Sequence, residues 1–425
     1  MTMTRTKLRE NVYLTYIPAV KFKTGYLSAQ FLTPLRPETA GYNALLCAVL
    51  DRGCRKYPDM ERLSAALDLL YGANVEHSIR KRGEYQLWGF VASAIDDAFV
   101  PEGGGHLLEG VAEILGELIC HPVLENGLLK RDYVDSEREN LLDAIRSAVN
   151  DKRTYAGKRL LEEMCRGEAY GLSHLGEEST VAPITAEVLT HHYLEQLSSS
   201  RLELYYCGRA ELERVIAAVQ PILQDLPRSR EAAITAPLPH IARPEPLVIR
   251  QAMDVSQGKL GVGFSVGSED RDAVFVMNTM FGGTSNSKLF LNVREKLSLC
   301  YYASSTYHRS KGLVTVSSGI EFENYQRALD EIQVQLECMK QGDWEDWELT
   351  GARSCIENGH RSIDDSAGRL EDFYMGQIAT GQRNTPQELM DAALAVTPER
   401  IMAAARSMSL DTVYFLTGKE ENTHA

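Results

Sequence analysis

The sequence predicts an α+β protein made of two homologous domains, each a mostly antiparallel sheet with helices packed on one face. A chain of 425 residues is long enough for two domains with separate cores. Residues 226–246 contain five of the fifteen prolines, which fix the backbone and remove hydrogen-bond donors, so this stretch is predicted to be a linker. Because the same order of elements recurs on both sides of it, we predict domains over residues 1–225 and 247–425.

The first half begins with a strand and two helices. Residues 27–31 alternate apolar and polar side chains, which is typical of a half-buried strand. A helix is predicted over residues 43–52, where Gly53 ends it, and a second helix begins after Asp59, a good N-cap residue. Two further strands and a long helical region are predicted over residues 73–79, 85–93 and 131–149.

The second half repeats this plan. Residues 260–266 alternate in the same way, and a helix is predicted over residues 272–281. A glycine turn, a helix, two strands and a long helical region follow at residues 282–283, 287–297, 299–308, 312–321 and 324–342. No regular strand–helix–strand alternation appears, so the sheets are predicted to be mostly antiparallel.

The composition narrows the range of partners. The net charge of -14 argues against nucleic acid or an anionic membrane as the main partner, because both attract basic surfaces. Residues 1–18 lack the apolar core of a signal peptide, and no apolar run is long enough to span a bilayer. The eight cysteines are scattered without a C-x-x-C pair, which suits a reducing compartment. We therefore expect a cytoplasmic protein with protein or peptide partners.

Two segments resemble the pitrilysin/insulinase-type metallopeptidases, the family that includes mitochondrial processing peptidase. The first is GYNALLCAVLDRGCRKYPDMERLSAALDLLYGANVEHSI, which is similar to the region where active members carry H-x-x-E-H on a helix. The second is FGGTSNSKLFLNVREKLSLCYYASS, which resembles the signature of the family's second domain. The resemblance extends over nearly the whole chain and implies the same two-domain fold.

The residues that bind zinc in active members are missing. There, two histidines four residues apart bind Zn²⁺ and the glutamate between them acts as general base. Counted back from Gly53, these positions hold Ala44, Cys47 and Ala48. Cys47 could supply only one of the four ligands that zinc needs, so a packing role is favoured over metal binding. The resemblance thus implies no catalytic residue and no metal in this chain.

Other acids and histidines near these motifs are also interpreted as packing or surface residues. His191 and His192 are adjacent and so point to different faces of a helix. Glu76 and His77 stand where active relatives commonly have an Asn-Ala pair beside the zinc. The peptide groove of the first domain is therefore in doubt.

Glu137 matches the family's third zinc ligand. It lies on the apolar stripe of its predicted helix, where an unpaired acid would be costly to bury, so we expect a raised pKa or an arginine partner. It is either a remnant of the zinc site or part of an ordinary salt bridge. Neither alternative restores catalysis without the histidines.

Arg294 and Tyr301 match the family's substrate-binding pair. A guanidinium and a phenol can both donate hydrogen bonds to main-chain oxygens, so the pair would bind peptides with little sequence preference. The alternative is an arginine on a solvated helix and a tyrosine in the core. The adjacent Gly-Gly turn, Leu-Phe pair and R-E-K sequence favour the substrate-binding role.

Three functions are compatible with these features. The favoured one is a non-catalytic, substrate-binding subunit of a heteromeric zinc endopeptidase, whose paralogous partner carries the zinc; a narrower resemblance points to zinc-less proteins linked to elongation factor P modification. The second is a structural assembly protein, like the peptidase-derived core subunits of a respiratory complex. The third, an independent peptidase with another metal site or nucleophile, has no supporting residues in the sequence.

Overall fold

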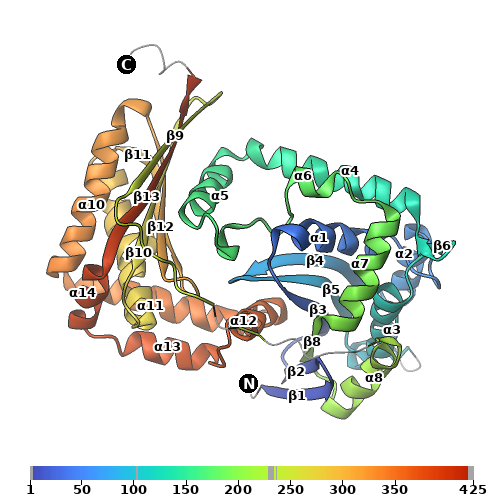
Figure 1. Cartoon of the computed structure of the whole chain (residues 1–425). Helices are drawn as coiled ribbons and strands as arrows, with labels where there is room; N and C mark the ends of the chain where they lie inside the picture. Colours follow the sequence, from blue (N-terminus) through green and yellow to red (C-terminus); the bar gives the residue numbers. More distant parts are fainter. Residues whose placement is uncertain (1–2, 102–103, 228–233, 236, 420–425) are drawn as a thin grey trace. The chain divides into compact units, whose positions relative to one another are not determined.

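The computed structural model describes residues 3–101, 104–227, 234–235 and 237–419. The chain forms two compact units, and Figure 1 shows its helices and strands. Unit 1 comprises Met1–Ser147, Leu172–Thr235 and Ser366–Gly381. Unit 2 comprises Ala148–Gly171, Ala236–Asp365 and Gln382–Ala425.

The main sheet of unit 1 has the strand order β1-β2-β8-β3-β5-β4 within the described residues. Only the β2–β8 pair is parallel, and the other four neighbouring pairs are antiparallel. The strands of unit 1 are β1 (Thr4–Arg9), β2 (Val12–Pro18), β3 (Thr24–Pro34), β4 (Asn74–Arg82), β5 (Tyr85–Ile95), β6 (Leu124–Glu125), β7 (Leu128–Leu129) and β8 (Arg201–Gly208). Its helices are α1 (Pro37–Asp51), α2 (Met60–Leu69), η1 (Asp97–Phe99), α3 (Leu107–Cys120), α4 (Arg131–Ser147), α6 (Glu178–Val181), α7 (Ala186–Ser199), α8 (Leu212–Asp225) and α12 (Ala367–Ala379).

The core of unit 1 lies between one face of this sheet and the helices α1, α3, α7 and α8. The predicted strand over residues 27–31 is the centre of β3, and its apolar residues Leu27, Ala29 and Phe31 are buried in that core. The predicted N-cap of α2 is confirmed, because the Asp59 side chain accepts a hydrogen bond from the Arg62 amide at 2.9 Å.

Unit 2 has a five-stranded sheet in the order β11-β12-β10-β13-β9, with only the β13–β9 pair parallel among its described strands. Its strands are β9 (Leu247–Met253), β10 (Gly258–Val266), β11 (Cys300–His308), β12 (Leu313–Ile320) and β13 (Met408–Gly418). Its helices are η2 (Ala148–Asn150), α5 (Lys152–Met164), η3 (Ala169–Gly171), α9 (Arg271–Asn278), η4 (Thr279–Gly283), η5 (Leu289–Lys296), η6 (Phe322–Asn324), α10 (Tyr325–Gln341), α11 (Asp346–Ile363), α13 (Pro386–Leu394) and α14 (Pro398–Arg406). The predicted mostly antiparallel α+β class is confirmed in both units.

Each sheet also carries, on its other face, a helix supplied by the other half of the sequence. In β10, Leu260, Val262 and Phe264 face the core of unit 2, so the intervening Gly261 and Gly263 face the opposite side. A Cβ atom at Gly261 would lie 3.1 Å from the Leu160 side chain of α5, and one at Gly263 would lie 2.6 Å from the Met164 sulfur. The two glycines therefore make room for α5.

The helix α12 occupies the corresponding face in unit 1. Ser28 alternates with the core residues of β3 and donates a hydrogen bond to Glu371 of α12 at 3.1 Å. Glu371 is fully buried and accepts hydrogen bonds from both Nη groups of Arg80 in β4, at 2.7 and 2.8 Å. A polar network thus fixes α12 on this sheet.

These exchanged helices explain how the units differ from the predicted domains. The helix α8 ends at Asp225 and β9 begins at Leu247. Residues 148–171 nevertheless belong to unit 2 and residues 366–381 to unit 1, because α5 and α12 pack there. Residues 228–233 and 236 of the predicted linker lie outside the described residues.

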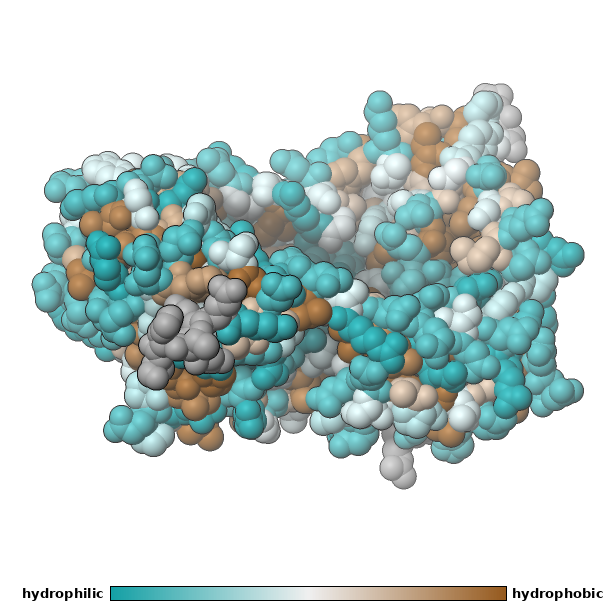
Figure 2. Space-filling model, turned by 90° about the horizontal axis from the view of Figure 1, so that it is seen from above, coloured by the Kyte–Doolittle hydropathy of each residue, from teal (hydrophilic) through white to brown (hydrophobic). Residues whose placement is uncertain are grey.

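The surface of the molecule is mostly hydrophilic, as expected from the charged composition of the chain. Figure 2 shows one face of the molecule, where hydrophilic residues predominate and hydrophobic residues appear in scattered positions. Among the described residues, none of the helices is both long and apolar enough to cross a membrane.

Candidate functional site

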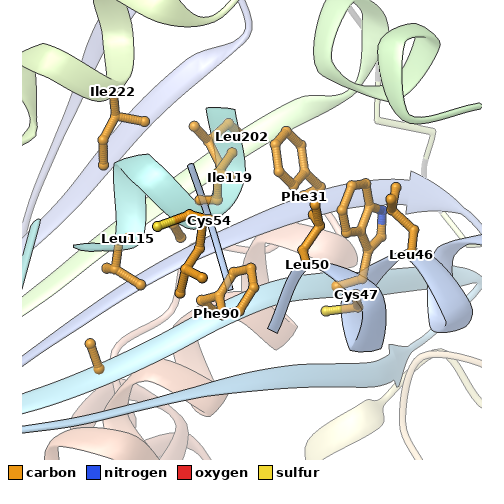
Figure 3. Close-up of a cluster of buried hydrophobic side chains, with 14 of the residues drawn as sticks. Phe31, Leu46, Cys47, Leu50, Cys54, Phe90, Leu115, Ile119, Leu202 and Ile222 are labelled. Carbon is orange, nitrogen blue, oxygen red and sulfur yellow. The ribbon is translucent and has the colours of Figure 1, made fainter. Parts of the chain in front are cut away.

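The three positions that match the zinc motif lie on α1. Ala44 and Cys47 are buried in the core of unit 1, and Ala48 is half-buried. Figure 3 shows Cys47 among apolar side chains that include Leu46 and Leu50 from the same helix. The helix face that carries the metal in active relatives is here a packed apolar surface.

The Cys47 thiol is satisfied without a metal. Its sulfur lies 3.2 Å from the Gly89 carbonyl oxygen and 3.8 Å from that of Ser78, so the thiol donates to the strands beneath it. Burial raises the pKa of Cys47 to about 12, which keeps the group a neutral thiol at physiological pH. This cysteine therefore does not fit the role of a zinc ligand.

Glu137 on α4 has the arginine partner that the sequence led us to expect. Arg52, which follows α1, donates from Nη1 to Glu137 Oε1 at 2.7 Å, and Asn140 donates to the other carboxylate oxygen at 3.0 Å. The Arg52 guanidinium also lies 5.0 Å from the ring centre of Tyr133. The acid at the third-ligand position is thus neutralised by a side chain of the protein.

His77 is placed by β4 and pairs with Asp51 at the end of α1. Its Nδ1 lies 2.7 Å from Asp51 Oδ2, and this hydrogen bond raises the pKa of His77 above its ordinary value. Cys47, Glu137 and His77 thus each have a hydrogen-bond partner within unit 1. They do not fit the catalytic zinc of active peptidases.

Arg294 and Tyr301 are brought together in unit 2. Both line a surface cavity of about 380 Å³, which we call the Arg294 cavity. The residues that line it are Arg294, Glu295, Ser298, Leu299, Cys300, Tyr301, Glu321 and Asn324. The alternative of a tyrosine in the core does not hold, because 60% of the Tyr301 surface is exposed.

Arg294 lies on an irregular helix. Residues Leu289–Lys296 form a π-helix, a rare geometry that is frequent at functional sites. The guanidinium carbon lies 4.5 Å from the ring centre of Phe290, and Nη1 lies 3.6 Å from Glu295 Oε1. The side chain is 40% exposed, so a ligand can approach it from solvent.

Tyr301 lies at a β-bulge. Cys300 pairs with Ile320 and Tyr302 pairs with Gly319, so Tyr301 is the extra residue between two adjacent partners on β12. A bulge of this kind turns a side chain away from the regular alternation. The Tyr301 hydroxyl donates to Glu321 Oε1 at 2.5 Å, and this hydrogen bond raises the pKa of Tyr301. The phenol is therefore a protonated donor at neutral pH.

Sequence reasoning missed Glu321 and Asn324. Glu321 directly follows β12, and the only signal for it was the antiparallel pairing of the two predicted strands, which brings the end of one beside the start of the other. Neither the bulge nor the π-helix can be predicted from the spacing of hydrophobic residues in the sequence.

Comparisons with known proteins agree with this fold. A family model described as "Peptidase M16 inactive domain" matches residues 183–354. A protein of Bacillus subtilis named "Probable inactive metalloprotease YmfF" is 34% identical over 404 residues, which cover 94% of this chain and 94% of that protein. The crystal structure of a conserved protein from Enterococcus faecalis is 28% identical with a TM-score of 0.89, covering 98% and 99% of the two chains. A peptidase M16 inactive domain from Pseudomonas fluorescens, 14% identical and covering 99% of each chain, has a TM-score of 0.79 and supports the fold alone.

Fold and site together define a protein derived from a zinc peptidase, in which the metal-binding positions have been replaced by packing residues. The chain belongs to the M16 family of pitrilysin/insulinase-type metallopeptidases, as a non-catalytic member without the family's zinc motif.

Proposed function

We propose that this chain is the substrate-binding subunit of a heteromeric zinc endopeptidase, and that a paralogous partner supplies the zinc. The observation that carries the proposal is that Arg294 and Tyr301 share one open cavity while Ala44, Cys47 and Ala48 cannot bind metal. A protein that had kept only the fold would have no need of an exposed arginine and phenol in one cavity.

The geometry suits main-chain recognition. The guanidinium offers several donors in a planar fork to the carbonyl oxygens of an extended peptide, and the Tyr301 oxygen, whose hydrogen goes to Glu321, can accept a hydrogen bond from a peptide N–H. β11, which carries Tyr301, is an edge strand of its sheet, and an extended peptide can add to such an edge. The expected ligand is a short unfolded peptide segment with little sequence preference.

The test is reconstitution. A chain from the same organism that carries H-x-x-E-H is expressed, and hydrolysis of a fluorogenic unfolded peptide is measured for each chain alone and for their mixture. The proposal predicts no zinc-dependent hydrolysis by this chain alone and a rate for the mixture at least tenfold above the partner alone. Equal rates for the partner alone and the mixture would contradict it.

A structural assembly protein is the second candidate. It predicts stable association with a partner without any change in peptide hydrolysis. The mixture experiment therefore separates the two functions, because only the first makes the rate depend on this chain. The link to elongation factor P modification is a further proposal, to be tested by measuring that modification in a strain that lacks this chain.

A further inference from the structure

A second cluster of reactive side chains lies in unit 2 and shares no residue with the Arg294 cavity. It joins three segments that are distant in sequence. Cys165 follows the last residue of α5, Glu168 lies in the turn before η3, and His240 comes from the segment that precedes β9. Cys165 is fully buried, and the His240 side chain is only 3% exposed.

The ligand atoms of these three residues lie close together. The Cys165 sulfur, a Glu168 carboxylate oxygen and a His240 ring nitrogen are all within 4.8 Å of one another. His240 Nδ1 is 2.6 Å from Glu168 Oε1, and its Nε2 is 3.1 Å from Oδ2 of Asp411 in β13. Among the described residues, this is the one group of three such side chains with metal-binding spacing.

This set of donors suits a borderline-soft divalent ion. Thiolate, imidazole and carboxylate are the ligands that zinc prefers, and three protein ligands with one water complete a tetrahedron. Histidine ligands usually donate their second ring hydrogen to a carboxylate, which fixes the ring. Asp411 is already in place for that role, and it is fully buried.

The charge balance of the cluster would survive metal binding. With both ring nitrogens directed at carboxylates, His240 is held as an imidazolium. A divalent ion would replace two protons, one from Nδ1 and one from the Cys165 thiol, so the net charge of this buried region would not change. Lys311, 2.6 Å from Glu168 Oε2, and Arg243, 3.7 Å from Asp411 Oδ1, can keep their present partners. A change of net charge in the interior is the main cost of burying an ion, and here it is avoided.

We propose that Cys165, Glu168 and His240 form a binding site for Zn²⁺, with Asp411 orienting the histidine. This site is separate from the degenerate motif on α1, and it departs from the sequence-based expectation that the chain binds no metal. A metal there would tie the end of α5 to the segment before β9 and to β13. The role of this metal would be structural, because none of the three residues that bind it lines the Arg294 cavity.

Proton competition sets the conditions for binding. A thiolate and a neutral imidazole are the forms that bind zinc, so the metal affinity rises with pH.

The experiment titrates the untagged, metal-free chain with Co²⁺ at pH 8 and follows the thiolate-to-cobalt charge-transfer absorption, which requires a cysteine ligand. The proposal predicts one Co²⁺ per chain, displaced by one equivalent of Zn²⁺. Cys165→Ser should abolish the band, whereas Cys207→Ser, which changes a buried cysteine of unit 1, should leave it unchanged. A titration without the band, or a band retained in Cys165→Ser, would overturn the proposal.

Two milder variants keep the test valid if Cys165→Ser fails to fold. Glu168→Gln removes a ligand whose side chain is 24% exposed, and Asp411→Asn changes only the group behind His240. We expect Asp411→Asn to weaken Zn²⁺ binding about 10- to 100-fold, the usual effect of losing such a carboxylate. Unchanged Zn²⁺ affinity in both variants, with circular dichroism like that of the wild type, would also refute the site.

Discussion

Arg52 donates a hydrogen bond to Glu137 at 2.7 Å and so connects the end of α1 with α4. The Glu137 side chain is 12% exposed, so its charge is largely withdrawn from water and depends on this partner. A carboxylate that would serve as a zinc ligand is thus used to join α4 to the end of α1. Of the two alternatives that the sequence left open, the structure shows the salt bridge.

Replacing Glu137 tests this interpretation. Glu137→Gln should lower the free energy of unfolding by about 1 kcal/mol, a modest cost because Arg52 is 36% exposed and stays partly hydrated. The measurement is urea denaturation followed by circular dichroism. Asp143→Asn, on a 79% exposed side chain of the same helix, is the control and should have no measurable effect. A loss of stability of 3 kcal/mol or more would show that the pair is more isolated from water than the structure indicates.

Glu321 is predicted to position Tyr301. The Tyr301 ring is mostly exposed, so its orientation depends on the hydrogen bond to Glu321 rather than on packing. Glu321→Ala should weaken the binding of a fluorescein-labelled unfolded peptide about threefold, whereas Glu321→Gln keeps an acceptor and should bind nearly as the wild type does. Fluorescence anisotropy measures both dissociation constants. Tighter binding by Glu321→Ala would mean that Glu321 competes with the peptide for the phenol.

Glu371 is predicted to hold α12 on the sheet of unit 1. Glu371→Ala leaves the Arg80 guanidinium, 21% exposed, without its fully buried partner, so we expect a loss of about 2 to 4 kcal/mol. Hydrogen exchange over residues 367–379 should accelerate at the same time. Asp372→Ala, on a 43% exposed neighbour, should cost less than about 1 kcal/mol. Unchanged exchange in Glu371→Ala would show that apolar contacts alone fix the helix.

The lowered pKa of His192 predicts how the stability of the protein changes with pH. Burial lowers its pKa to about 4, with a smaller contribution from His191, whereas in the unfolded chain it titrates near its ordinary value of about 6.5. Between these values the unfolded state binds the proton more tightly, so stability is lost as the pH falls. From pH 7 to pH 5 the contribution of this group amounts to about 2 kcal/mol.

The variant His192→Gln should reduce that pH dependence. Glutamine can still donate to Asn43, which His192 Nε2 contacts at 2.7 Å. Urea denaturation at pH 7 and pH 5 measures the difference, and His191→Gln, on the exposed neighbour, is the control. An identical pH dependence in His192→Gln and the wild type would contradict the assignment.

Local features of the fold were predictable, but the exchange of helices was not. Alternation at residues 27–31 identified the strand and its core face, but the predicted half-buried strand is buried on both faces, because Ser28 and Gln30 are also buried. The cap at Asp59 was predicted correctly, since a cap depends on neighbours in sequence. Periodicity shows that α5 has an apolar face, but not which sheet it covers. Gly261 and Gly263 were the sequence feature that indicated this contact, since glycines on one face of a strand indicate that another element packs closely there.

The candidate site was predictable only through the family resemblance. Arg294 and Tyr301 are seven positions apart, and that spacing alone does not imply contact with one ligand. A π-helix and a β-bulge bring them into one cavity, and both are irregularities that average patterns conceal. Glu321 lies in the same cavity because β12 pairs with β11. The sequence predicts these two strands but not the register of their pairing.

The most direct test of the central claim is the rate of peptide hydrolysis by the zinc-bearing partner reconstituted with variants of this chain. Arg294→Ala should lower kcat/KM about 10- to 100-fold, because hydrogen bonds to a charged donor contribute about 1.5 to 3 kcal/mol. Arg383→Ala, at an exposed arginine outside the Arg294 cavity, should leave the rate unchanged. If Arg294→Ala and the wild type support equal rates while binding the partner equally well, this chain does not hold the substrate.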